Sequence, residues 1–287
     1  SWGIDSRNGY PDRLPAQARA VLAKASERTL NRQSMQAEGA SKHPTSIQHI
    51  AAGTLPKLGK DQTRPSFILW GDSHAKVAMP AFDAFAKQHG LSGRAAILYS
   101  TAPFLDFDSG LPNGETNVIE YSERLLQMIR DQNVKDFYLS AYWSLYVKIM
   151  GEEKFRDIFS ETVDRIAATG ATVWILMDVP THQIDVPKAM VGTHMFPFLD
   201  WRIEGCTYED HHQKNSVVFD LAGQNLQARF IDPAPGLMNK ATGRYDVMRE
   251  ARPLYYDDNH LTADGSLEVI TPVLFAISPL GQLGQQL

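Results

Sequence analysis

The sequence predicts an α/β protein, a three-layer α/β/α sandwich in which helices cover both faces of a five-stranded parallel sheet. Two features of the chain lead to this prediction. From residue 66 onward, short apolar runs alternate with longer stretches whose apolar residues recur at helical spacing. This alternation is typical of βαβ units, whose strands are parallel. The short runs are also apolar at consecutive positions, as expected for strands that helices bury on both sides.

Length and composition agree with a globular chain and exclude some functions. The 287 residues suffice for one large α/β domain or for a domain with an appendage. The net charge is −5, from 28 basic and 33 acidic residues, and there is no long basic run, so we expect no nucleic acid partner. No apolar run approaches the ~20 residues of a membrane-spanning helix. Cys206 is the only cysteine, so no internal disulfide can form.

The first part of the chain differs from the rest. Pro15 is expected to open a helix over residues 15–33, and residues 34–64 are polar and without pattern. We therefore predict an extension over residues 1–64 that packs on a main domain over residues 65–287. A partly disordered linker over the same residues is an equally good interpretation.

The main domain is predicted to begin with a strand over residues 66–70 and a helix over residues 74–89. Gly90 ends this helix, and Pro80 is expected to kink it or to delay its start. The other strands are predicted over residues 94–99, 134–140, 172–177 and 229–231. The other helices are predicted over residues 118–132, 152–169, 208–227 and 263–277.

The stretch Leu69-Trp70-Gly71-Asp72-Ser73-His74-Ala75 joins the first strand to its helix. Ligands bind at the carboxyl ends of strands in open α/β sheets, which is where Ser73 stands. Its backbone N–H belongs to a helix start and can face a developing negative charge. Ser73 is therefore placed like a nucleophile, with Asp72 and His74 as polar neighbours that fix its surroundings. A serine that only caps the helix is the alternative interpretation.

A second motif, Tyr255-Tyr256-Asp257-Asp258-Asn259-His260-Leu261-Thr262, precedes the last predicted helix. An acid three residues before a histidine can hold one ring nitrogen while the other faces a serine. This is the arrangement of base and orienting acid found at acyl-transfer sites. Because the first and last loops both open on the carboxyl edge of the sheet, we expect His260 to lie beside Ser73. Either Asp257 or Asp258 could supply the carboxylate.

The two motifs, in this order and with these flanks, resemble the SGNH (GDSL-like) hydrolase superfamily. Within it they are most similar to the SGNH domains fused to acyltransferase-3 membrane domains, the bacterial surface-polysaccharide O-acetyltransferases, over roughly residues 64–280. The resemblance implies an SGNH-hydrolase, flavodoxin-like fold and a triad of Ser73, His260 and Asp257. In the family two residues separate the acid from the histidine, and this spacing favours Asp257 over Asp258.

The expected oxyanion donors depart from those of the superfamily. Its members use the N–H of the serine, the N–H of a glycine after the second strand and an asparagine after the third strand. Here Thr101 and Ala102 follow the second strand, and Trp143 follows the third. Losing one such donor typically costs ~3–4 kcal/mol of transition-state stabilisation, so a substitute is needed. The candidates are the N–H groups of Ser73, Thr101, Ala102 and Trp143, while core packing is the alternative role for Trp143.

The resemblance implies a periplasmic or otherwise extracytoplasmic O-acetyltransferase domain, tethered at the inner membrane. It would carry an acetyl group on Ser73 and pass it to a hydroxyl of a surface polysaccharide such as lipopolysaccharide O-antigen. Its partners would be an acyltransferase-3 transmembrane domain, expected in the same polypeptide, and a carbohydrate acceptor. This chain would hold no cofactor, because the membrane domain delivers an acetyl group that comes ultimately from acetyl-CoA. Two alternatives stay open: a carbohydrate esterase that uses water, and a glycan-binding module with a vestigial site.

Other residues suggest no further chemistry. The adjacent His211 and His212 point about 100° apart on a helix, which is poor geometry for a shared metal ligand set. We therefore predict no metal site. Cys206 lacks a matching histidine signature and is not expected to be a nucleophile. His182 is expected at the surface. The aromatic-rich loop over residues 195–201 either stacks on sugar rings or, as we expect, packs down on the domain.

Overall fold

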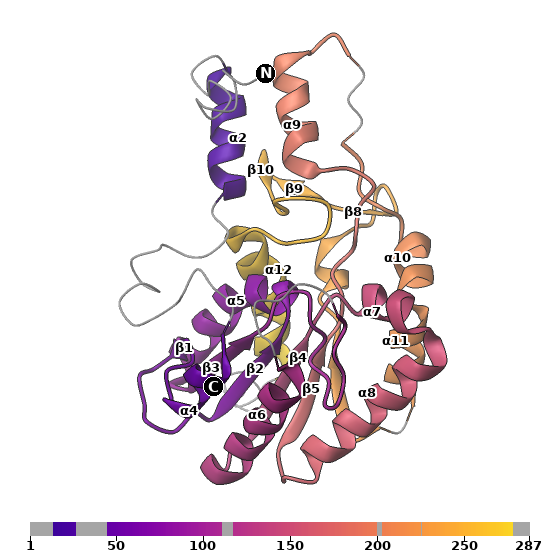
Figure 1. Ribbon diagram of the computed structural model, residues 1–287. Helices are drawn as coiled ribbons and strands as arrows, with labels where there is room; N and C mark the ends of the chain where they lie inside the picture. Colours follow the sequence, from indigo (N-terminus) through magenta and orange to yellow (C-terminus); the bar gives the residue numbers. More distant parts are fainter. Residues whose placement is uncertain (1–13, 27–44, 111–116, 200–202, 225, 278–287) are drawn as a thin grey trace, which may run out of the picture.

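The computed structural model describes residues 14–26, 45–110, 117–199, 203–224 and 226–277 (Figure 1). Its central sheet has six strands in the order β1-β3-β2-β4-β5-β6. The strands are β1 (Lys57–Gly59), β2 (Phe67–Gly71), β3 (Ser92–Ile97), β4 (Asp136–Ser140), β5 (Thr172–Leu176) and β6 (Ala228–Ile231). Strands β2 to β6 are parallel and correspond to the five predicted strands. The predicted fold class is therefore confirmed, with one correction: β1 adds a sixth strand, antiparallel to β3.

Each central strand is buried on both faces. In β2, Phe67 and Leu69 belong to one apolar cluster and Ile68 and Trp70 to another, because successive side chains of a strand point to opposite faces. The first cluster lies under α5 (Ser73–His89) and α12 (Ala263–Ile277), which pack against each other. The second lies under α6 (Val118–Gln132) and α8 (Glu152–Ala167). These two helix layers and the sheet form the three-layer sandwich (Figure 1).

The chain before β2 contains more structure than its polar composition indicates. Helix α2 (Ala16–Ser26) packs beside α9 (Val186–Met195) and near β10 (Arg252–Pro253), as Figure 1 shows. Helix α4 (Ile47–Ala51) packs on α6. With β1, α4 corrects the expectation that residues 34–64 have no regular elements, although residues 27–44 lie outside the described part. The division into residues 1–64 and 65–287 stays a prediction, but the central sheet begins before that boundary.

Several other elements differ from the prediction. The helix expected over residues 208–227 is two helices, α10 (Tyr208–Lys214) and α11 (Ser216–Ala222), separated at Asn215. Helix α5 starts at Ser73 and runs continuously past Pro80 to its left-handed Gly90 cap. Helices α7 (Trp143–Met150) and α9 are not predicted from the sequence. Nor are the 3-10 helix Ala234–Leu237 and the short strands β7 (Met238–Asn239), β8 (Arg244–Tyr245), β9 (Met248–Arg249) and β10. Among the described helices, none has the length and apolarity needed to cross a bilayer.

Candidate active site

The junction between β2 and α5 places Ser73 at the carboxyl edge of the sheet. Strand β2 ends at Gly71, where an added Cβ would lie 1.7 Å from the carbonyl oxygen of Ser140, so only glycine fits beside β4. Asp72 caps α5, and its Oδ1 accepts the backbone N–H of His74 at 2.8 Å. Ser73 is the first residue of a helix of 17 residues. Its N–H thus belongs to the first turn, whose unpaired N–H groups favour negative charge.

The segment before α12 brings a histidine and an acid to this serine. The Nε2 of His260 lies 2.8 Å from the Oγ of Ser73, although 187 positions separate the two residues. The Nδ1 of His260 lies 2.7 Å from the Oδ2 of Asp257. The backbone N–H groups of Asn259 and His260 donate to Oδ1 of Asp257, at 2.9 and 2.7 Å. The side chains of Asp257, His260 and Ser73 form an unbroken line of hydrogen bonds.

The surroundings of Asp257 keep it ionised. Partial burial raises the pKa of this carboxyl, but the hydrogen bonds from His260 and from the backbone N–H groups outweigh burial and hold the pKa below its usual value. An ionised carboxylate at Nδ1 is what stabilises an imidazolium. Asp258 lies elsewhere: its side chain accepts the amide of Asn259 at 3.1 Å, and its carbonyl accepts the N–H of His182 at 2.8 Å. Of the two acids, the geometry therefore favours Asp257.

The imidazole of His260 lies between two rings. Tyr256 stacks on it with an interplanar angle of 8° and a centroid distance of 5.1 Å. The ring of His74 lies 4.7 Å from His260, tilted by 45°, and itself stacks on Tyr142 at 4.7 Å. Burial first, and His260 second, lower the pKa of His74 well below its ordinary value. His74 is therefore neutral at pH 7 and does not add a positive charge beside His260.

Two buried carboxylates fix the start of α7 behind the site. The Oδ2 of Asp72 accepts the N–H of Tyr142 at 3.1 Å and the hydroxyl of Tyr146 at 2.9 Å. Asp178, just past the end of β5, accepts the N–H groups of Trp143 and Ser144 at 2.9 and 3.1 Å. Burial raises the pKa of Asp72, and it raises the pKa of Asp178 to about 7 despite these donors.

Of these supporting residues only Asp72 is predicted from the sequence, while Tyr142, Tyr146 and Asp178 are missed. A signal for two of them is present in the chain. Tyr142 and Asp178 follow the carboxyl ends of predicted strands, the edge at which α/β proteins gather their functional groups. Tyr146, in contrast, lies within the apolar sequence of α7, and nothing in that sequence indicates that its hydroxyl donates to the buried Asp72.

The oxyanion candidates fare differently. Trp143 is fully buried against aromatic rings, its indole N–H donates to the carbonyl of Leu176 at 2.8 Å, and its backbone N–H is held by Asp178. No N–H of Trp143 is left for an oxyanion. The expectation that it is an oxyanion donor is therefore wrong, and its role is core packing. Thr101 and Ala102 are buried in the loop after β3, which is parallel to β2 and ends at the same edge. They stay predicted donors, as does Ser73. Ser100 precedes them with φ of 55°, a region that favours glycine.

The other residues considered from the sequence have clear positions in the fold. His182 is buried, which corrects the expectation that it lies at the surface. Phe198 is 80% exposed and Phe196 and Leu199 are also exposed, so the described part of the 195–201 loop does not pack down on the domain. Cys206 is buried, and burial raises the pKa of its thiol to about 11. Within the described residues, no group of three histidine, cysteine or acidic side chains is arranged to hold a metal ion.

Fold and site together define an SGNH-type α/β protein, with a serine, a histidine and an aspartate meeting at the carboxyl edge of the sheet. The chain belongs to the family described as "SGNH domain (fused to AT3 domains)", whose model matches residues 39–274. The resemblance read from the two motifs is thereby confirmed. The family description also places such domains in polypeptides that carry AT3 domains.

Comparison with one solved structure supports the fold. The periplasmic domain of the lipopolysaccharide acetyltransferase of Salmonella ser. Paratyphi A aligns with a TM-score of 0.64 at 15% identity, over 88% of this chain and 97% of that one. A putative acylhydrolase from Bacteroides fragilis is more distant, with a TM-score of 0.42 at 15% identity, over 79% of this chain and 95% of that one. No curated protein sequence matches the chain. The family match thus makes the chain an SGNH domain, and the Salmonella structure shows the same fold.

Proposed function

We propose that this chain is an extracytoplasmic O-acetyltransferase domain that passes an acetyl group from Ser73 to a hydroxyl of a cell-surface polysaccharide, such as lipopolysaccharide O-antigen. The observation that carries this proposal is the line of hydrogen bonds from Asp257 through His260 to Ser73. Family membership supports acyl transfer. The similar Salmonella structure, which is the periplasmic domain of a lipopolysaccharide acetyltransferase, suggests the acceptor and the compartment.

In the first half of the reaction, His260 acts as base. Its Nε2 takes the proton of Ser73 while Oγ attacks the acetyl carbonyl of the donor, and the donor's leaving group departs with that proton. Ser73 then carries the acetyl ester. Asp257 holds the proton of His260 on Nδ1 and stabilises the imidazolium. The N–H of Ser73, at the start of α5, faces the developing oxyanion.

In the second half, the sugar hydroxyl is the nucleophile. It gives its proton to Nε2 of His260 and attacks the acetyl carbon. The bond between the acetyl group and Ser73 Oγ breaks, and Oγ regains a proton from His260. In this proposal the AT3 membrane domain delivers the acetyl group, ultimately from acetyl-CoA, and the chain needs no cofactor of its own.

The two alternatives use the same site differently. In a carbohydrate esterase, water replaces the sugar hydroxyl, and product analysis with and without a sugar acceptor distinguishes the two enzymes. In a glycan-binding module with a vestigial site, the triad would have no role. The close contacts of Ser73, His260 and Asp257 favour a working site over this third function, because a binding role does not require them.

Ser73→Ala tests the proposal directly. We expect it to lower acyl transfer about 10⁴-fold or more, because only binding and oxyanion stabilisation remain after a triad nucleophile is removed. The measurement is acetylation of the acceptor glycan, together with release of the phenol from an aryl acetate. Unchanged far-UV circular dichroism and thermal unfolding would show that the fold is intact. Turnover retained by a pure Ser73→Ala protein would rule out Ser73 as the nucleophile.

A further inference from the structure

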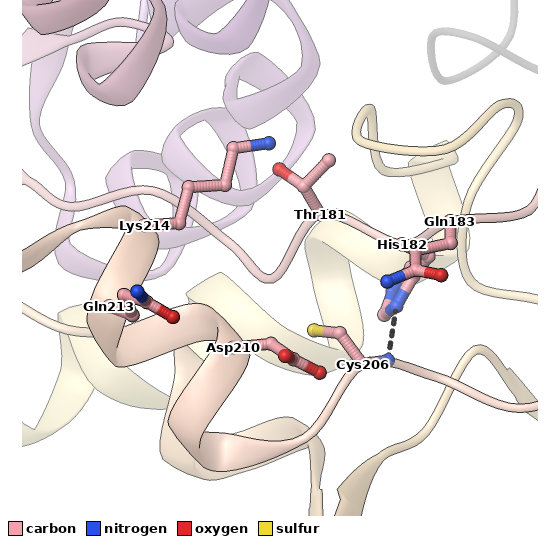
Figure 2. Close-up of a pocket in the computed structure, with 7 residues that line it drawn as sticks. All are labelled: Thr181, His182, Gln183, Cys206, Asp210, Gln213 and Lys214. Carbon is pink, nitrogen blue, oxygen red and sulfur yellow. Dashed lines mark hydrogen bonds between the residues drawn. The ribbon is translucent and has the colours of Figure 1, made fainter.

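A pocket with a volume of about 300 Å³ lies between the loop after β5 and α10 (Figure 2). Its floor is formed by two buried side chains, His182 and Cys206. The N–H of Cys206 donates to Nδ1 of His182 at 3.1 Å, which fixes the imidazole in place. The other lining residues are all polar and surround this floor: Thr181, Gln183, Asp210, Gln213 and Lys214.

The chemistry of the pocket suits a neutral, hydroxyl-rich ligand. Burial lowers the pKa of His182 to about 4 and raises the pKa of the Cys206 thiol to about 11, so the floor is uncharged at pH 7. Asp210 and Lys214 contribute one charge of each sign. The amides of Gln183 and Gln213 each offer donors and acceptors, and a carboxylate and an ammonium add more of both kinds. A sugar hydroxyl, which both donates and accepts, matches this mixture better than an anion does.

Contacts join this pocket to both segments of the candidate active site. Lys214 Nζ donates to the hydroxyl of Tyr142 at 2.6 Å, and the ring of Tyr142 stacks on His74, beside His260. On the other side, the N–H of His182 donates to the carbonyl of Asp258, the neighbour of Asp257. The pocket is thus linked to His260 through Tyr142 and His74, and to the neighbour of Asp257 through His182.

We propose that this pocket is an acceptor subsite, which holds one neutral hexopyranose of the glycan whose neighbouring residue presents its hydroxyl to Ser73. Its volume is at the lower end of small-ligand pockets, which suits one sugar ring. The assignment deepens the proposed function and rests on it for the transfer step, but binding of a sugar can be measured without turnover.

The first experiment measures binding in Ser73→Ala protein. Methyl glycosides of glucose, galactose, mannose and rhamnose are titrated, with methyl glucuronide as the anionic counterpart, while NMR follows the backbone amide of Cys206 on the pocket floor. We expect a saturable shift with at least one neutral glycoside and weaker binding of the glucuronide. Adding Gln183→Ala and Gln213→Ala should weaken that binding about tenfold, the loss expected for two hydrogen bonds. No saturable shift, or a preference for the glucuronide, would overturn the assignment.

The second experiment measures how the acetyl-enzyme partitions. The chain is acylated with an aryl acetate in the presence of the best-binding glycoside, and the ratio of acetylated sugar to free acetate is determined. The Gln183→Ala, Gln213→Ala double variant should lower this ratio about tenfold. Gln127→Ala, a substitution of an exposed glutamine on α6, is the matched control.

An unchanged ratio of acetylated sugar to free acetate in the double variant would exclude the pocket as an acceptor subsite. This holds whether the rates of transfer to sugar and of hydrolysis both stay the same or both fall by the same factor. If the wild-type chain transfers no acetyl group to any sugar but the NMR titration shows saturable binding, the proposed transferase activity is excluded and the sugar-binding pocket is supported. If acetyl transfer to a sugar is observed but the titration shows no saturable shift, the transferase activity is supported and the pocket is excluded as the acceptor subsite. The two proposals are thus tested separately.

Discussion

At the scale of single residues, the choice between two adjacent acids is decided by the backbone around them. The N–H groups of Asn259 and His260 both point at Oδ1 of Asp257, which leaves Oδ2 for the ring of His260. Asp258 is instead turned toward Asn259, and its carbonyl is held by His182. From the residues alone both acids are possible, because spacing does not say which of two neighbours the turn directs inward.

We therefore expect Asp257→Asn to be severely impaired and Asp258→Asn to be mildly affected. Replacing a triad aspartate by asparagine favours the wrong tautomer of the histidine and removes the charge that stabilises the imidazolium, a loss of about 10⁴-fold in kcat in serine hydrolases. The measurement is kcat for an aryl acetate, with the two variants serving as controls for each other. If Asp258→Asn were the more damaging change, the orienting role would belong to Asp258.

His74 is expected to position His260 without touching the reacting atoms. Its neutral ring fills the space between His260 and Tyr142. His74→Ala should lower kcat by up to about 10²-fold, because small misplacements of a catalytic group have effects of that size. His74→Phe keeps a flat ring and should restore most of the rate. If Phe and Ala variants were equally slow with equal KM, stacking would not be the role of His74.

At the scale of elements, the parallel strands can be predicted because each carries consecutive apolar residues between helical stretches, although Arg94 and Arg229 stand within β3 and β6. The start of α7 cannot be predicted in this way. Its residues Trp143–Met150 are apolar nearly all round, and no residue with a capping side chain stands just before them. Its cap comes from Asp72 and Asp178, which lie 70 and 35 positions away from their partners at the start of this helix. The strand β1 is missed because three residues give no readable alternation.

The buried Asp178 predicts a pH dependence of stability. Its folded pKa, about 7, is raised above the usual value for an aspartate. At pH values below its unfolded pKa, Asp178 is protonated and makes its full contribution to the free energy of unfolding. That contribution, on the order of a few kcal/mol, is lost as the pH rises through the folded pKa of about 7. The free energy of unfolding of Asp178→Asn, which cannot ionise, should lack this decline between pH 4 and 8.

The measurement is the wild-type free energy of unfolding minus that of Asp178→Asn, determined in urea at each pH. The difference removes the contributions of other groups, including Asp257, whose lowered pKa acts in the opposite direction. Asp164→Asn, an exposed substitution on α8, should leave the pH profile unchanged. A difference that is flat from pH 4 to pH 8 would mean that folding does not raise the pKa of Asp178.

At the scale of the whole molecule, the two motifs at opposite ends of the domain meet because the fold directs both loops to one edge. This convergence can be predicted from the order of strands and helices, since parallel strands share a carboxyl edge. The oxyanion donors cannot, because they depend on loop conformations such as that of Ser100, with its φ of 55°. Trp143 is misassigned for the same reason: its partners, Leu176 and Asp178, lie on another strand and in the loop after it.

The membrane domain of the family gives the last prediction. The chain lacks the glycine and asparagine donors of the superfamily at the expected positions, so we expect fewer fixed dipoles at the oxyanion and slow hydrolysis of an aryl acetate by the isolated chain. Slow attack by water suits a transferase, which must keep its acetyl group until a sugar hydroxyl arrives. Tethering to an AT3 domain raises the effective concentration of the donor. Acetylation of the native glycan in cells should therefore require the fusion.

The test is to express this chain alone in the envelope compartment of a strain that lacks the fused enzyme, and to compare its glycan acetylation with that of a strain in which the chain is joined to an AT3 domain. Ser73→Ala in the fused form is the matched control, since it keeps the tether and removes the nucleophile. We expect acetylation only in the fused, unsubstituted form. Full acetylation by the untethered chain would contradict the prediction that acetylation requires fusion to the AT3 domain, because a freely diffusing donor would then suffice. Fast removal of acetyl groups from the glycan would instead identify an esterase, since water would then compete successfully for the acetyl group on Ser73.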